Sequence, residues 1–203
     1  MAPQNLVQIK IGKRVANNRL RIIGGTWRSR RLQFIDSPKI RPTPDRVRET
    51  LFNWLANDIK GSVCLDLFAG SGALGFEAMS RGADRVMLVE EDARIAAMLS
   101  EQKELFDAQE IEIKNQNALT YLPNANQQYD LIFLDPPFYS DLLEKVIPII
   151  LKQKLLNANG LIYVESAAQQ KTIQSLEILL ETLYCIREKV SGEVRYALYK
   201  GDA

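Results

Sequence analysis

The sequence predicts an α/β fold built on a mostly parallel sheet with helices on both faces. From residue 62 onward, strand-like and helix-like segments alternate regularly. A glycine-rich turn within "CLDLFAGSGALGFEA" (64–78) joins a strand to a helix, and the chain ends in two strand-like runs joined by "SGE" (191–193). Repeated strand–helix units build parallel sheets, whereas the final pair can only form a hairpin. The last strand is therefore expected to run antiparallel.

The segment before residue 59 predicts a small N-terminal extension. Residues 1–18 show no sustained hydrophobic period and are expected to form a flexible tail. At 19–34, "RLRIIGGTWRSRRLQF" places two strand-like runs around a glycine pair, which is typical of a β-hairpin. The expected domains are thus the tail, a basic hairpin and helix at 19–58, and a sheet domain at 59–203.

A helix is expected within "RPTPDRVRETLFNWLAND" at residues 41–58. Thr43 can serve as its N-cap, with Pro44 at the first helical position. Apolar side chains then recur at helical spacing, at Val47, Leu51, Trp54 and Leu55.

The sheet domain has a regular series of predicted elements. Strands are expected near residues 62–67, 85–90, 111–115, 129–134 and 160–165. Helices are expected near residues 72–81, 92–106, 141–153 and 169–180.

Composition is that of an ordinary globular protein, with 46% hydrophobic and 25% charged residues among 203. The apolar runs are too short to cross a bilayer and no secretory signal is recognisable, so we expect a cytoplasmic protein that contacts no membrane. The absence of histidine excludes histidine-dependent triads and most zinc sites, and no metal is expected. Cys64 and Cys185 lie in strand-like apolar stretches, which predicts buried thiols.

Charge is distributed unevenly along the chain. The whole chain carries a net +1, but residues 1–48 contain twelve Lys and Arg against two acids. A basic arm on an acidic body is typical of proteins that bind a polyanion, although solvated basic tails also occur. Arg28, Arg30 and Arg31 follow Trp27, whose ring could stack on RNA bases or pack in the interior.

The glycine turn is typical of a site for an adenosine cofactor. In "GSGALG" (70–75), small residues let a ligand approach both the backbone and a helix N-terminus. Glu90 stands at the tip of the next strand, twenty residues after Gly70, where a carboxylate can accept hydrogen bonds from ribose hydroxyls. Glu91 and Asp92 compete for this role, but they follow the strand and are expected instead to cap the next helix.

Two cofactor classes fit this turn, a dinucleotide and S-adenosylmethionine. Nothing further along the chain supplies a nicotinamide partner. A site for S-adenosylmethionine would instead have an acid in the first strand, a polar–apolar pair after the third strand and a substrate-binding turn after the fourth. Asp66, Asn117 with Ala118, and "LDPPF" meet these three expectations.

The substrate turn lies in "YDLIFLDPPFYS" at residues 129–140. Pro136 and Pro137 cannot continue a sheet ladder, because proline lacks an amide hydrogen and has a fixed φ. The sequence therefore predicts a stiff, exposed turn that carries Asp135 and Phe138.

These motifs, taken together, resemble class I S-adenosylmethionine-dependent methyltransferases that modify exocyclic amines of nucleobases. More narrowly, "RIIGGTWRSRRL", "RPTPDRVRETLFNWL", "DLFAGSGALGFEA", "LDPPF" and "IYVES", in that order, resemble the RsmD family of 16S rRNA guanine-N2 methyltransferases. The resemblance runs from about residue 19 to 200. It implies a Rossmann-like methyltransferase fold, a seven-stranded, mostly parallel sheet with an antiparallel last strand, plus the small basic hairpin and helix extension.

The resemblance also implies roles for individual residues. The methionine side of the cofactor would be lined by Asp66, Phe68, Gly70 and Gly72, the ribose held by Glu90, and the adenine held by Asn117 and the Ala118 amide. The target amine would be held by the Asp135 carboxylate and the Pro136 carbonyl, with Phe138 stacking on the base. RNA would be bound by Arg28, Arg30, Arg31 and Arg41. Thr43 could reach the cofactor or the RNA, or only cap a helix, and Glu165 borders the same cleft as a weaker candidate.

The sequence thus predicts a monomeric enzyme that methylates guanine N2 in 16S rRNA, the family's usual target being guanine 966, on the small subunit or an assembly intermediate. A cytosine-C5 mechanism is disfavoured, because it would need a cysteine nucleophile in the cleft. Three alternatives remain: a DNA adenine-N6 methyltransferase, a non-catalytic RNA-binding assembly factor with this fold, and a nicotinamide oxidoreductase.

Overall fold

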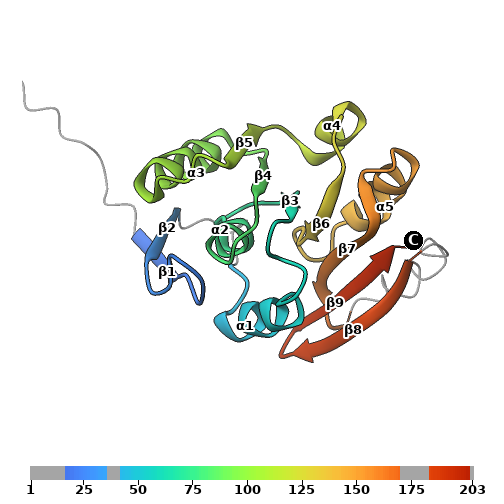
Figure 1. Cartoon of the computed structure of the whole chain (residues 1–203). Helices are drawn as coiled ribbons and strands as arrows, with labels where there is room; N and C mark the ends of the chain where they lie inside the picture. The colour runs from blue at the N-terminus through green and yellow to red at the C-terminus, as the bar shows by residue number, and fades with distance from the viewer. Residues whose placement is uncertain (1–16, 36–41, 170–182, 202–203) are drawn as a thin grey trace, which may run out of the picture.

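A seven-stranded β-sheet forms the middle of the molecule (Figure 1). The structure, a computed structural model, describes residues 17–35, 42–169 and 183–201. The strands are β1 (Asn17–Arg21), β2 (Arg31–Ile35), β3 (Val63–Asp66), β4 (Arg85–Glu90), β5 (Ile111–Asn115), β6 (Tyr129–Leu134), β7 (Leu156–Ala167), β8 (Leu183–Ser191) and β9 (Val194–Gly201). The helices are α1 (Asp45–Trp54), α2 (Ala73–Ser80), α3 (Ala93–Phe106), α4 (Ala118–Tyr121), the 3-10 turn η1 (Leu122–Asn124) and α5 (Leu142–Lys152).

The strand order is β5-β4-β3-β6-β7-β9-β8. Strands β3 to β7 pair in parallel, whereas β9 lies antiparallel between β7 and β8. The predicted mostly parallel sheet with a reversed last strand is therefore confirmed. The order changes direction between β3 and β6, and at such a switch point the loops after neighbouring strands diverge and leave a crevice for a ligand.

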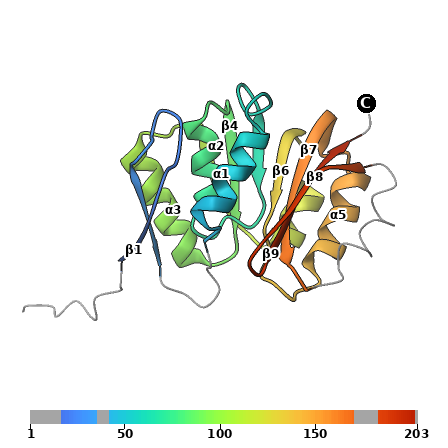
Figure 2. The same ribbon diagram turned by 90° about the horizontal axis from the view of Figure 1, so that it is seen from below.

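Helices cover both faces of the sheet. Residues of α1, α2 and α3 share one hydrophobic core with one side of the strands, and residues of α4 and α5 share a second core with the other side. Helices α3 and α5 accordingly lie on opposite sides of the strands in Figure 2. Strand β6 shows why, since Leu131 and Phe133 enter the first core while Ile132 and Leu134 enter the second.

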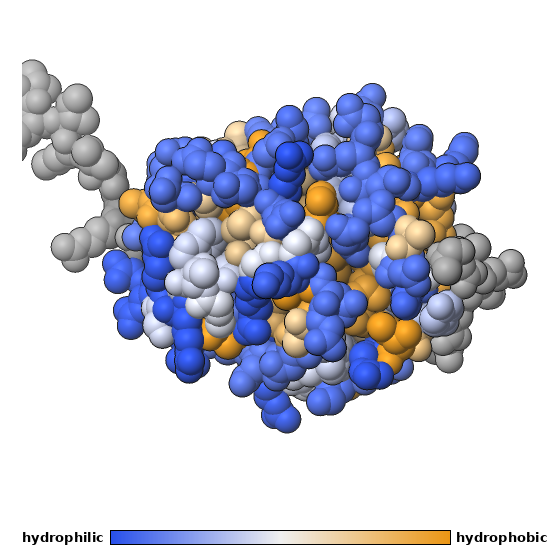
Figure 3. Space-filling model, viewed as in Figure 1, coloured by the Kyte–Doolittle hydropathy of each residue, from blue (hydrophilic) through white to orange (hydrophobic). Residues whose placement is uncertain are grey.

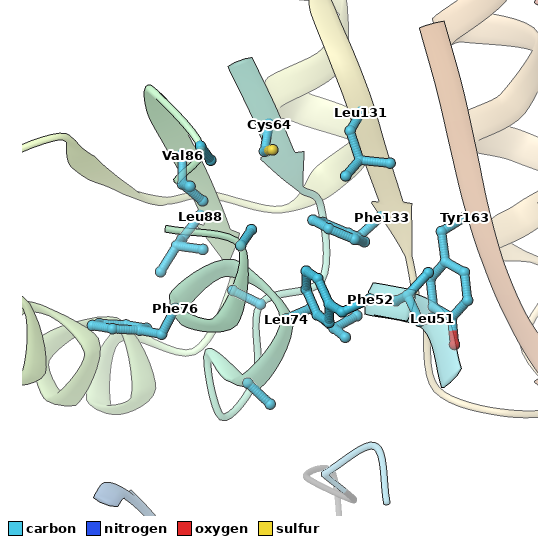
Figure 4. Close-up of a cluster of buried hydrophobic side chains, with 14 of the residues drawn as sticks. Leu51, Phe52, Cys64, Leu74, Phe76, Val86, Leu88, Leu131, Phe133 and Tyr163 are labelled. Atoms are coloured by element: carbon cyan, nitrogen blue, oxygen red, sulfur yellow. The ribbon is translucent and has the colours of Figure 1, made fainter. Parts of the chain in front are cut away.

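A row of aromatic rings joins α1 to the sheet (Figure 4). The Phe52 ring centroid lies 6.1 Å from that of Phe133, which in turn lies 6.2 Å from that of Tyr163 in an edge-on arrangement. All three side chains are fully buried. Helix α1 is thereby part of the same core as the sheet domain.

The N-terminal hairpin docks on α2 through the buried carboxylate of Glu77. Its two oxygens accept hydrogen bonds from the backbone N–H groups of Ile23 and Gly24, at 2.7 and 2.8 Å. The same carboxylate pairs with Arg81 at 2.7 Å and lies 3.5 Å from the buried Arg48 guanidinium. A carboxylate buried so completely is tolerated because it accepts three hydrogen bonds and lies near two guanidinium groups.

The predicted hairpin is confirmed, but its glycines do more than turn the chain. Residues 22–30 connect β1 to β2, a longer connection than a two-residue turn. Gly25 has φ +76°, and a Cβ there would lie 1.7 Å from the carbonyl oxygen of Ser80. That carbonyl accepts a hydrogen bond from the N–H of Thr26 at 2.7 Å, so only glycine permits this approach to α2.

Two expectations about individual residues were wrong. Thr43 does not cap α1: the helix begins at Asp45 with Pro44 at the N-cap and no side-chain cap. Cys185 is exposed, whereas Cys64 is buried as predicted. The reason is that Cys185 lies on β8, the edge strand of the sheet, where most side chains are exposed.

Some predicted features lie outside the described residues, namely the tail up to residue 16, Arg41 and the helix at 169–180. In the part of the chain that the structure describes, no helix combines the length and the apolar character needed to span a membrane.

Candidate active site

A cavity of about 390 Å³ opens at the carboxyl ends of β3, β4, β6 and β7. A smaller recess of about 50 Å³ shares part of its lining and reaches Asp66. The lining brings together most of the sequence-predicted site residues: Asp66, Phe68, Gly70, Glu90, Asn117, Ala118, Asp135, Pro136 and Phe138, with Thr43 and Glu165. The switch point in strand order explains this convergence.

Gly72 is the predicted cofactor residue that lines neither cavity. It is the N-cap of α2 with φ +75°, and a Cβ there would lie 2.7 Å from a Leu99 methyl group and 2.9 Å from the Phe76 ring. Gly72 therefore permits a left-handed turn and close packing, while Gly70 faces the ligand space.

Glu90 is tied into the glycine turn. Its Oε2 accepts a hydrogen bond from the N–H of Gly70 at 3.0 Å, and its Oε1 accepts one from the N–H of Asp92 at 2.8 Å. Burial raises the pKa of the carboxyl, although these two hydrogen bonds oppose the shift. A carboxylate has about four acceptor positions, so lone pairs remain for two ribose hydroxyls.

Asn117 lines the cavity and also caps a helix. Its Oδ1 accepts a hydrogen bond from the N–H of Leu119 and so caps α4, while its Nδ2 donates to Glu91 at 2.8 Å. Asp92 caps α3 as expected, but Glu91 instead faces the cavity beside Asn117. The sequence favoured helix capping for Glu91 over a place in the cofactor site, and the structure shows that Glu91 lines the cavity.

Asp66 is a buried carboxyl at the bottom of the recess. It is 2% exposed, and its Oδ2 accepts a hydrogen bond from the N–H of Gly75 at 3.1 Å. Burial, together with the nearby charge of Asp135, raises its pKa to about 7. A cationic ligand group placed in the recess would restore the ionised form.

The "DPPF" turn places Asp135 directly after β6. The Thr43 hydroxyl donates a hydrogen bond to Asp135 Oδ2 at 3.2 Å, and burial raises the pKa of Asp135 to about 7. The turn is exposed only in part: Pro137 and Tyr139 are exposed, Asp135 and Phe138 are partly exposed, and Pro136 is buried. Phe138 packs against the first core.

Glu165, which is hydrogen-bonded to Tyr163, forms part of the wall of the cavity. Glu165 is 2% exposed, and its Oε1 accepts a hydrogen bond from the Tyr163 hydroxyl at 2.8 Å. The residue lies within β7, which continues to Ala167, instead of at the strand tip. The "IYVES" motif contains both residues, but only the cavity shows that Glu165 faces Asp135 and Thr43.

The thiol of Cys64 is unsuited to covalent catalysis. It is buried in β3 beside the Ser62 hydroxyl, at 3.2 Å, and burial raises its pKa to about 12. Neither cysteine lines the two cavities. Nucleophilic cysteines need a thiolate, which this environment suppresses.

The arginines of the hairpin separate into two groups. Arg28, Arg30 and Arg31 are all exposed, and hydrophilic residues cover most of the face seen in Figure 3. Arg30 differs in its contacts, because it donates to the carbonyl of Leu105 at 2.7 Å and places its guanidinium 3.9 Å from the centre of the Phe106 ring. Its energetic role is therefore in part to hold the hairpin on α3.

Of the two roles expected for Trp27, stacking on RNA or packing in the interior, the structure shows packing in the interior. Its ring centroid lies 5.1 Å from that of Phe106 and 6.2 Å from that of Phe76, and the side chain is partly buried. The tryptophan thus packs the hairpin against α2 and α3 in the described structure.

Comparison with known proteins shows the family of the chain. The family model described as "Conserved hypothetical protein 95" matches residues 20–200. "Ribosomal RNA small subunit methyltransferase D" of Escherichia coli strain K12 is 43% identical over 187 residues, which cover 92% of each chain. The chain belongs to the RsmD family. The RsmD relative from Haemophilus influenzae is 41% identical over 189 residues, or 91% of this chain and 95% of that one.

The RsmD match extends to the three-dimensional structure. The solved structure of yhhF from Escherichia coli has a TM-score of 0.81 and 41% identity, and the match covers 92% of this chain and 99% of that one. Because the family model spans residues 20–200, the N-terminal hairpin and the terminal β8–β9 hairpin are both parts of the RsmD pattern.

Proposed function

We propose that the protein transfers a methyl group from S-adenosylmethionine to the N2 amine of a guanine in 16S rRNA. The observation that carries the proposal is that Asp135 of the "DPPF" turn lines the same cavity as Gly70 and Glu90. An amine-binding group and an adenosine-binding loop thus share one space. The names of the RsmD relatives supply the ribosomal RNA substrate.

The residues present fit the proposed cofactor. Glu90 keeps free acceptor positions for ribose hydroxyls, and the buried Asp66 carboxyl suits the cationic methionine end. Asn117 and Glu91 border the part of the cavity where the adenine would lie. S-adenosylmethionine supplies a methyl group that is already activated by its positively charged sulfur.

The chain's own residues would then position the target amine. An exocyclic amine on guanine is a poor nucleophile, because its lone pair is delocalised into the ring. The Asp135 carboxylate and the Pro136 carbonyl would accept its two N–H groups and favour the more pyramidal, more basic nitrogen of the transition state. Phe138 would stack on the base, a contact worth roughly 1–3 kcal/mol.

The base must leave its helix or come from a loop to enter a cavity of this depth. The exposed Arg28 and Arg31 would bind backbone phosphates beside it. We also propose Arg41, which lies outside the described residues, as an RNA contact, and a monomer as the working form.

The test is a labelled methyl-transfer assay. The protein is incubated with methyl-labelled S-adenosylmethionine and small subunits or 16S rRNA from cells that lack it, and the RNA is then digested to nucleosides. We expect label in N2-methylguanosine. Label in N6-methyladenosine would contradict the guanine assignment, and RNA binding without label would favour the assembly factor.

A matched variant locates the chemistry. Asp135→Ala is expected to abolish transfer while the affinity for S-adenosylmethionine stays within about threefold, since the residue contacts the amine and not the cofactor. If Asp135→Ala loses activity only because it no longer binds S-adenosylmethionine, Asp135 would instead be assigned to the cofactor site.

A further inference from the structure

Tyr139 is an exposed aromatic side chain at the mouth of the cavity, and the proposed function assigns it no role. It is 76% exposed, and it lines the cavity together with Asp135 and Phe138. Among the residues that the structure describes, none forms a hydrogen bond or a ring contact with its side chain. A single exposed aromatic residue is ordinary at a protein surface, so the backbone decides whether this one is unusual.

The backbone of Tyr139 has a conformation that large side chains rarely adopt. Its φ is +62°, in the left-handed region. Residues 137–140 form a turn in which the N–H and the hydroxyl of Ser140 both donate to the carbonyl of Pro137, at 3.3 and 2.7 Å. Tyr139 is third in this turn, where a positive φ ordinarily requires glycine or asparagine. The turn thus carries a tyrosine that local preference opposes.

The other non-glycine residues with positive φ in the described structure have local reasons for it. Asp107 is the C-cap of α3 and Lys154 directly follows the C-cap of α5, and helices commonly end in this conformation. Asn159 is of a type that tolerates it, and Ser29 is a small residue between β1 and β2. Neither reason applies to Tyr139. Backbone strain of this kind is typical of functional sites.

The two consecutive aromatic residues of the turn differ in exposure. Phe138 packs against the first core and lines the cavity, whereas Tyr139 is exposed at its rim. A target base that stacks on Phe138 therefore leaves the Tyr139 ring uncovered. Because the Cα atoms of consecutive residues lie about 3.8 Å apart, the nucleotide next to the target can reach that ring.

The charges near Tyr139 favour a base over a phosphate as its partner. Glu91 and Asp135 line the same cavity, and their negative charges would repel a phosphate. Two residues after Tyr139, Asp141 already pairs with Lys145 at 2.7 Å. Every nucleobase presents an aromatic face, and such faces stack on tyrosine without needing a cation.

We propose that the Tyr139 ring stacks on the base of the nucleotide next to the target guanine, so that the protein selects RNA in which this neighbour is unpaired. The inference rests on the proposed function, which places the target base against Phe138. A base can be splayed onto an aromatic side chain in loops, bulges and ends, where it has no pairing partner. Contact with Tyr139 therefore favours a loop over a helix.

The test compares Tyr139→Asn, which removes the ring and suits a positive φ, with Tyr139→Phe, which retains the ring. Filter binding measures affinity for small subunits from cells that lack the protein, with S-adenosylhomocysteine present so that no methyl group is transferred. Tyr139→Asn is expected to weaken binding roughly 5- to 100-fold, and Tyr139→Phe less than about threefold. Tyr184→Asn, at an exposed position of β8, is the control.

Two outcomes of this comparison would overturn the proposal. Unchanged affinity in Tyr139→Asn would show that the ring has no RNA contact. An equal loss in Tyr139→Phe would assign the contact to the hydroxyl, as expected for a hydrogen bond to phosphate or ribose.

The stability of the protein without RNA distinguishes binding from a structural role. Asparagine tolerates a positive φ better than tyrosine, so Tyr139→Asn is expected to have a urea midpoint equal to or above that of the unaltered protein. Its affinity for S-adenosylmethionine should stay within about twofold. A lower urea midpoint would show that the side chain stabilises the fold, against the proposal.

A stem-loop RNA with one guanine in its loop identifies the base. The nucleotide on either side of the guanine is replaced in turn by an abasic one. One replacement is expected to weaken binding of the unaltered protein by the factor seen in Tyr139→Asn, and to weaken that variant no further. Additive losses at both positions would contradict the stacking.

Protein-free 16S rRNA identifies the class of partner. Tyr139→Asn is expected to lose the same factor in affinity for this RNA as for small subunits. A loss confined to intact subunits would assign Tyr139 to a ribosomal protein and overturn the proposal.

The binding assays need no turnover, so this inference and the proposed function can fail separately. If the protein transfers no methyl group but Tyr139→Asn binds RNA weakly, only the proposed function is contradicted. If guanine is methylated and Tyr139→Asn binds RNA normally, only the stacking is contradicted.

Discussion

The Thr43 hydroxyl donates a hydrogen bond to the Asp135 carboxylate at 3.2 Å, although 92 residues separate the two along the chain. Thr43 precedes α1, and Asp135 follows β6. The segment that begins the N-terminal helix is therefore a direct part of the candidate active site. Changes in that segment are expected to affect methyl transfer as well as RNA binding.

Asp135 is expected to lower stability at neutral pH. Its folded-state pKa of about 7 lies above the ordinary value of 3.8, so its stabilising effect is complete below about pH 4 and is lost as the pH rises to about 7. Asp135→Asn should therefore be more stable than the unaltered protein at pH 8, by about 1–4 kcal/mol, and equally stable at pH 4. Urea unfolding of the cofactor-free protein at both pH values measures this difference. An equal difference at both would show that Asp135 titrates normally.

Glu90→Gln is expected to weaken S-adenosylmethionine binding about 10- to 100-fold. Both Glu90 oxygens accept backbone N–H groups, and an amide can accept only one of these bonds. The glycine turn would lose its position and the ribose would lose an acceptor. Isothermal titration calorimetry gives the affinity, with Glu101→Gln as the control. An unchanged dissociation constant would remove Glu90 from the cofactor site.

The exposed hairpin arginines are expected to determine the salt dependence of RNA binding. Replacing Arg28 and Arg31 with Gln should reduce the slope of log K against log salt by about 1.4, because each phosphate contact to single-stranded RNA contributes about 0.7. Filter binding at several salt concentrations measures the slope, with Lys152→Gln on α5 as the control. Arg30→Gln should mainly lower stability, since its side chain is held by Leu105 and Phe106. An unchanged slope in the double variant would show that Arg28 and Arg31 do not bind RNA phosphates.

Glu77→Gln is expected to destabilise the protein by about 3–5 kcal/mol. The substitution leaves Arg48 buried near a neutral amide and removes an acceptor from the hairpin backbone at Ile23 and Gly24. Urea unfolding followed by tryptophan fluorescence measures the loss, and Trp27 would report release of the hairpin. Glu110→Gln, at an exposed position before β5, is the control. A loss below about 1 kcal/mol would show that the hairpin docks mainly through apolar packing.

Local patterns predicted most elements of the sheet domain. Strands β4, β5 and β6 have the predicted bounds, because their apolar runs end at acids, asparagine or proline that act within a few residues. The reversal of β9 also followed from its short connection to β8. Periodicity is a property of neighbouring residues and can be read without a partner.

The predictions that were wrong concern residues whose environment depends on segments far away in the sequence. Thr43 was expected to cap its own helix, but Asp135 takes its hydroxyl hydrogen. Cys185 was expected to be buried, but β8 became the edge of the sheet.

The sequence by itself determined the class of fold, the glycine turn, the "DPPF" turn and the absence of histidine chemistry, because each is a matter of residue type and local spacing. Only the tertiary structure decided that Asp66, Asp135 and Glu165 lie around one space and that Thr43 donates a hydrogen bond to Asp135. Strand order and register determine which side chains become neighbours, and burial in that shared space changes their pKa values. Proximity of this kind is absent from the linear chain, and the proposed chemistry depends on it.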